Sequence, residues 1–61
     1  MSEPVFDIFK DKKGEFRFNL KAANGEIILA SQGYASKESC LKGIESVKIN
    51  AINAKIVEAK D

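Results

Sequence analysis

The sequence predicts an α+β domain with the element order β-β-β-α-β. Two segments near the N-terminus alternate apolar and polar residues, a pattern typical of strands with one buried face. Glycine-containing turns separate these segments from each other and from a third apolar run. A later segment repeats apolar residues at helical spacing. Together these patterns predict an antiparallel meander with one helix packed on one face of the sheet.

The first two strands are predicted at residues 5–10 and 15–21, and the loop between them fixes their register. A three-residue loop that ends at Gly14, where a positive φ costs little, places Ile8 opposite Phe18 on the apolar face. A loop one residue longer would bury the carboxylate of Asp7 there, so the apolar pattern favours the shorter loop. The apolar face of the second strand then carries Phe16, Phe18 and Leu20.

The dipeptide Asn24-Gly25 is the strongest hairpin signal in the chain. It predicts a two-residue type I′ turn, in which both residues take positive φ. Such a turn places Leu29 opposite Leu20, and it puts Ile27 and Leu29 on the face of the phenylalanines. Residues 32–35 then end the third strand.

A helix is predicted to begin after Ser36, a favourable N-cap residue, and to end near residues 50–53. Its narrow apolar stripe consists of Cys40, Ile44, Val47 and Ala51. Gly43 lies within the helix at a cost of about 1 kcal/mol relative to alanine. We therefore expect a close approach of the helix to its neighbours at this position.

A second apolar flank and a short C-terminal strand complete the pattern. Leu41, Ile49 and Ile52 lie outside the helical stripe. They give the helix more apolar surface than a lone monomer needs to bury. Residues 54–59, A-K-I-V-E-A, predict a fourth strand around Ile56. These apolar residues are the candidate dimer interface: Leu41, Ile49, Ile52 and Ile56.

The length supports one small domain over residues 1–61, with an ordered core at about 5–59. A chain of 61 residues buries only about 60% of its unfolded surface. Small folds gain stability from disulfides, metals or association, and a single cysteine excludes an internal disulfide. Self-association is therefore expected from size alone.

Composition argues against catalysis. The chain has no histidine, so it offers neither an imidazole base nor a histidine-ligated metal site. Its one thiol, Cys40, lies on the helical stripe and is expected to pack in the core. No catalytic residue, cofactor or metal is expected, and the protein is predicted not to be an enzyme. Without a secretory leader or an apolar span, a cytoplasmic location and no membrane partner are expected.

One local excess of positive charge falls on the first two strands, although the whole chain carries only +1. Phe9, Arg17 and Lys21 are expected on the outer face of the sheet, with Phe9 opposite Arg17. Aromatic and basic residues on an open sheet are typical of proteins that bind single strands. The pattern makes weak binding of single-stranded nucleic acid an alternative function, while a solvated charged face is the simpler interpretation.

The ordered set of these motifs resembles the YegP-like family of small bacterial proteins. The resemblance rests on F-x-I-F-K-D-K-K-G-E-F-R-F-N-L-K-A-A-N-G-E-I-I-L-A-S, followed by G-Y-x-S-K and G-I-E-S-V-K. It covers about residues 6–51. It implies a β3-α-β unit that works in pairs, as tandem copies or as a homodimer with exchanged C-terminal strands. The family has no established activity, so it implies no catalytic or ligand residues.

These observations favour a homodimeric, non-enzymatic binding or interaction module. The chain itself is the one partner that size and resemblance both indicate; any other partner is unknown from the sequence.

Overall fold

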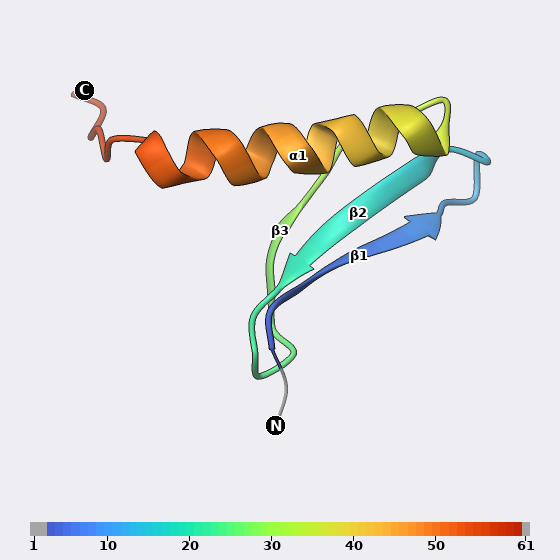
Figure 1. Ribbon diagram of the computed structural model, residues 1–61, viewed down its shortest axis with the longest axis horizontal. Helices are drawn as coiled ribbons and strands as arrows, with labels where there is room; N and C mark the ends of the chain where they lie inside the picture. The colour runs from blue at the N-terminus through green and yellow to red at the C-terminus, as the bar shows by residue number, and fades with distance from the viewer. Residues whose placement is uncertain (1–2, 61) are drawn as a thin grey trace.

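The alternating segments pair into a three-stranded antiparallel sheet, and one helix lies across one face of it (Figure 1). The computed structural model describes residues 3–60. The strands are β1 (Val5–Lys10), β2 (Phe16–Lys21) and β3 (Ile27–Ala30), in the sheet order β1-β2-β3. Helix α1 (Lys37–Asn53) follows. The predicted α+β meander with one covering helix is confirmed.

The register of the first hairpin is the predicted one. Ile8 pairs with Phe18, and Phe9 pairs with Arg17. The backbone N–H of Asp11 donates to the Glu15 carbonyl at 2.8 Å, which closes a three-residue loop. Gly14 takes a φ of +84°, the conformation for which glycine is suited.

The second hairpin uses the same type of loop, so the predicted type I′ turn is wrong. Asn24 does not take positive φ; its side-chain oxygen accepts the N–H of Glu26 at 3.0 Å, and Gly25 alone is left-handed. This loop places Ile27 opposite Lys21 on the outer face, whereas the prediction put Ile27 on the apolar face. A bulge in β3 then restores the predicted pair of Leu20 with Leu29.

Helix α1 begins as predicted. The hydroxyl of Ser36 accepts the N–H of Ser39 at 3.1 Å, which satisfies one of the free donors of the first turn. The first half of the predicted stripe is buried, with Cys40 fully enclosed and Ile44 9% exposed. Ala51, further along the stripe, is exposed.

The core forms where β2 meets the first half of α1. Phe18 is 2% exposed and clusters with Cys40 and Ile44. The ring of Tyr34 stacks on Phe18 with centroids 6.2 Å apart. Tyr34 also lies against Gly43, where an added Cβ would be 2.8 Å from the ring carbon that bears the hydroxyl. The close approach expected at Gly43 is therefore made by this tyrosine.

The predicted fourth strand is not formed by the described chain. After α1, residues 54–60 have no regular structure, and the helix carries them away from the sheet (Figure 1). A strand needs a neighbouring edge to satisfy its backbone groups, and this segment has none within reach. The side chains of Ile56 and Val57 are 101% and 84% exposed.

The contact at Gly43 makes a testable prediction. Replacing Gly43 with alanine adds a Cβ against the Tyr34 ring. Overpacking of this kind costs about 1–3 kcal/mol, which outweighs a gain in helix propensity of about 1 kcal/mol. We expect Gly43→Ala to lower the free energy of unfolding, measured by urea denaturation at a fixed protein concentration.

A second variant isolates the cause. In a Tyr34→Leu background the ring is absent, so the Gly43→Ala change should become neutral or stabilising. Greater stability of Gly43→Ala with Tyr34 present would contradict the close packing described.

Candidate functional site

The outer side of the first hairpin is organised by one carboxylate. One oxygen of Asp11, Oδ1, accepts the backbone N–H groups of Lys13 and Glu15, both at 2.9 Å. The other, Oδ2, pairs with Nε of Arg17 at 2.6 Å. Arg17 also donates through Nη1 to the carbonyl of Ser31 at 3.2 Å, so it links the turn to the segment that follows β3.

These contacts set the titration of Asp11. The hydrogen bond from Arg17, followed by that from the backbone N–H of Glu15, holds the pKa of the Asp11 carboxyl below its usual value of 3.8. Partial desolvation acts in the opposite direction and is the weaker effect. Asp11 is therefore a fixed structural anion at neutral pH.

The three residues predicted for nucleic-acid binding do share the outer face, but both cations are engaged. Phe9 pairs across the strands with Arg17 and is 40% exposed. Arg17 is paired with Asp11, as described above. Nζ of Lys21 lies 3.0 Å from Oδ2 of Asp7. Arg17 and Lys21 are thus each paired with a carboxylate of the first strand or the first turn.

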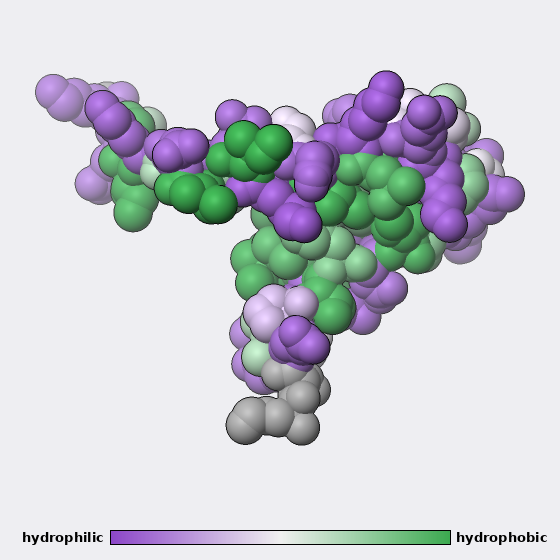
Figure 2. All heavy atoms as spheres, in the orientation of Figure 1, coloured by the Kyte–Doolittle hydropathy of each residue, from purple (hydrophilic) through white to green (hydrophobic). Residues whose placement is uncertain are grey.

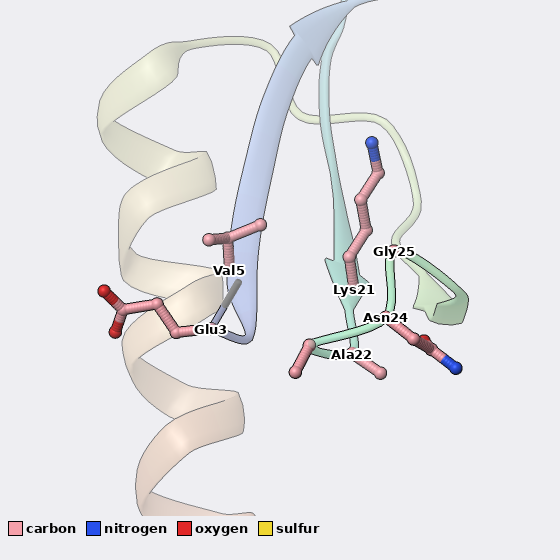
Figure 3. A pocket seen from close by; sticks show the side chains of 7 residues that line it. Glu3, Val5, Lys21, Ala22, Asn24 and Gly25 are labelled. Atoms are coloured by element: carbon pink, nitrogen blue, oxygen red, sulfur yellow. The ribbon is translucent and has the colours of Figure 1, made fainter. Parts of the chain in front are cut away.

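Two further features bear on chemistry. Among residues 3–60, no three potential metal-ligating side chains of Asp, Glu, His or Cys come together. A shallow open hollow of about 400 Å³ lies between the start of β1 and the second turn (Figure 3). Its lining includes the charged residues Glu3 and Lys21, and Lys21 is already paired with Asp7. The hollow therefore presents no arrangement of an acid, a base and a nucleophile.

The candidate dimer residues are exposed in the single chain. Leu41 is 48% exposed, Ile49 60%, Ile52 83% and Ile56 101%. Figure 2 shows hydrophobic side chains on the part of the helix that projects beyond the sheet. Val57, which is not among the predicted interface residues, is 84% exposed as well. Its position beside Ile56 in the predicted fourth strand could have indicated that it belongs with them. We call these five residues the uncovered apolar surface.

The structure is thus that of a small α+β domain with an open sheet face and a large uncovered apolar surface. No helix among the described residues is both long and apolar enough to cross a bilayer. A family profile described as "Domain of unknown function (DUF1508)" matches residues 11–58. The chain belongs to this family.

Its relatives agree with the resemblance drawn from the motifs. A UPF0339 protein of Methanosarcina acetivorans is 56% identical over 52 residues, which cover 85% of this chain and 90% of the relative. The UPF0339 protein YegP of Yersinia pestis is 56% identical over 46 residues, 75% of this chain but 41% of the relative. The predicted YegP-like family is confirmed.

A solved structure supports the fold. The solution structure of a protein from Haloferax volcanii matches with a TM-score of 0.84 and 42% identity, covering 97% of this chain and all of that one.

The anion at the first turn predicts a pH dependence. Because the folded-state pKa of Asp11 is lowered, its stabilising effect is fully present above about pH 4 and is lost as the pH falls through the folded-state pKa. The difference in free energy of unfolding between the natural chain and Asp11→Asn should therefore be constant near neutrality and shrink below pH 3.8.

The lowered pKa of Asp11 can also be measured directly by NMR. The ¹³C shift of the Asp11 carboxyl should titrate with a midpoint below 3.8, and the Arg17→Ala variant should raise that midpoint. A midpoint at or above 3.8 in the natural chain would exclude the ion pair as a lasting feature in solution.

Proposed function

We propose that this protein acts as a homodimer and serves as a non-enzymatic binding module. The observation that carries the proposal is the uncovered apolar surface along α1 and in residues 54–60. This surface consists of Leu41, Ile49, Ile52, Ile56 and Val57. Figure 2 shows hydrophobic side chains gathered on the projecting part of the helix, and large exposed apolar patches mark interaction sites.

A second copy of the chain is the partner that energetics favours. Burial of each large aliphatic side chain contributes about 1.5–3 kcal/mol. One chain buries just three side chains among the described residues, namely Phe18, Cys40 and Ile44. Dimerisation would bury several more side chains of the same size, which is a large gain for a domain with so small a core.

The lengths of the relatives support the same arrangement. The match to YegP of Yersinia pestis occupies 41% of that protein, which leaves room for a second unit of this size in the same chain. Two linked units in one protein and two separate chains are equivalent ways to bring a pair of such units together. The Methanosarcina acetivorans relative, matched over 90% of its length, has room for one unit.

The binding role is supported by the character of the open sheet face. It carries the ion pairs Asp7–Lys21 and Asp11–Arg17, and Phe9 of the same face is partly exposed. Preformed ion pairs flanked by apolar groups can contact another surface without a large cost of ordering. Such a face suits recognition rather than chemistry.

The assembly is tested by sedimentation equilibrium at micromolar concentration. We expect the mass of two chains, and we expect Ile49→Asp to shift the equilibrium strongly toward the monomer because it places a charge in the interface. Ile28→Asp is the matched control. Ile28 lies in β3, outside the uncovered apolar surface, and its exposed fraction of 59% nearly equals the 60% of Ile49.

Three results would count against the proposal. One is a folded monomer of 6.7 kDa at these concentrations. Another is a dimer insensitive to both Ile49→Asp and Ile56→Asp. The third is a dimer that Ile28→Asp disrupts as strongly as Ile49→Asp does.

The nucleic-acid alternative makes a separate prediction. Because Arg17 and Lys21 are paired with carboxylates, we expect fluorescence anisotropy at low salt to detect no binding of single-stranded oligonucleotides up to about 100 μM, in the range of non-specific affinities. Binding that weakens steeply with salt and is lost in Arg17→Ala would overturn this expectation.

A further inference from the structure

We propose that Asn24, in the second turn, is a site of spontaneous covalent modification, at which the side-chain amide is lost as ammonia. The inference goes beyond the proposed dimer and does not depend on it. Asn24 and Gly25 are both exposed. Figure 3 shows the side chain of Asn24 pointing away from Glu3 and Val5, so nothing of the hollow encloses it. Asparagine is among the residues that are chemically labile, and its surroundings in the fold decide how labile.

The reaction joins two atoms that are close along the chain. The backbone nitrogen of Gly25 attacks Cγ of Asn24, so that an N–C bond forms, the nitrogen loses its proton and Nδ2 leaves as ammonia. Water then opens the five-membered succinimide. Opening at Cγ gives an aspartate, and opening at the backbone carbonyl carbon gives an isoaspartate, whose main chain runs through Cβ and Cγ. One asparagine and one water become one acidic residue and one ammonia.

The contacts of the turn favour this attack. Oδ1 of Asn24 accepts the N–H of Glu26 at 3.0 Å, and the ring that this hydrogen bond closes contains both reacting atoms. The same hydrogen bond draws electron density away from Cγ. Gly25 has no side chain to shield its nitrogen, and the space that a Cβ would occupy is open.

One contact restrains the reaction, and the second turn has fewer such contacts than the first. The N–H of Gly25 donates to the carbonyl of Ala22 at 2.9 Å, which holds the proton that must leave. In the first turn, the carboxylate of Asp11 accepts two further backbone N–H groups. Ala22 occupies the equivalent position in the second turn and has no such group. The second turn therefore opens more easily, and the attack proceeds from the open turn.

The other three asparagines are held in regular structure, and each is followed by a residue with a side chain. Asn19 lies in β2, the central strand of the sheet. Asn50 and Asn53 lie in α1, and Nδ2 of Asn50 donates to the carbonyl of Ser46 at 2.8 Å. A helical or strand backbone keeps the following nitrogen away from the side-chain carbonyl carbon. These residues are thus internal references for Asn24.

The modification changes both the charge and the length of the loop. It takes the formal net charge of the chain from +1 to zero. The isoaspartate also adds one atom to the main chain between Ala22 and Glu26, whose N–H and carbonyl close the loop at 2.8 Å. Because loop length sets the register of a hairpin, this product should weaken the pairing of Lys21 with Ile27.

Tryptic mapping of the full chain, aged in mildly alkaline buffer, tests the inference. Cleavage after Lys21 and Lys37 separates Asn24 from the other asparagines. We expect Asn24 to convert at least about tenfold faster than any of them, because its turn opens far more readily than the helix or the central strand. Aspartate and isoaspartate should both form.

Asn24→Lys is the matched control. The first turn, which has the same type of loop, carries Lys13 before Gly14, so lysine suits this position. This variant should not develop the acidic shift on ion exchange that the natural chain acquires with age. Asn24→Asp carries the new charge on a normal backbone, and the isoaspartyl form of the natural chain should unfold at a lower Tm than this variant.

The outcomes are decisive whether the chain is a monomer or a dimer. Faster conversion of another asparagine would overturn the inference. So would an intact Asn24 after a period in which a peptide of residues 21–27 converts completely, or an acidic shift that persists in Asn24→Lys. Equal Tm values for the isoaspartyl form and Asn24→Asp would overturn the consequence for the hairpin.

Discussion

The packing of Phe18 against Cys40 and Ile44 is the contact on which the rest of the structure depends. These side chains are the buried set among the described residues, and they join the middle of the sheet to the first half of the helix. Phe6 and Tyr34 pack around Phe18, and Gly43 admits the tyrosine ring. The partly buried side chains that pack against this small core include Ile8, Phe16 and Val47.

The confined core explains why the C-terminal part of the helix remains uncovered. The 17-residue helix extends beyond the sheet (Figure 1), so Ile49 and Ile52, which follow Val47, remain exposed. The same excess of apolar surface that would destabilise a monomer can stabilise a pair. On the outer face of the sheet, the contacts of Asp11 and Arg17 link the first turn and β2 to the segment that follows β3.

Features set by local rules could be predicted from the sequence. The register of the first hairpin followed from excluding Asp7 from the core, and the helix start followed from Ser36. The conformation of the second turn could not be predicted in this way. The side chain of Asn24 stabilises a turn in which Asn24 does not take positive φ, and a bulge in β3 then restores the predicted pair of Leu20 with Leu29. The pairing of Arg17 with Asp11 was also missed, since it depends on the loop bringing residues six positions apart into contact. The predicted fourth strand is absent because a strand needs a neighbouring edge, and the described residues of this chain bring none within its reach.

In the proposed dimer, folding and association are coupled, and thermal unfolding over a hundredfold range of protein concentration measures that coupling. If two chains share their apolar surface, mass action stabilises the folded dimer as concentration rises, and Tm should increase by several degrees, on the order expected for a domain of this size. A Tm that stays constant across the range, with a single cooperative transition, would show that the chain folds without association.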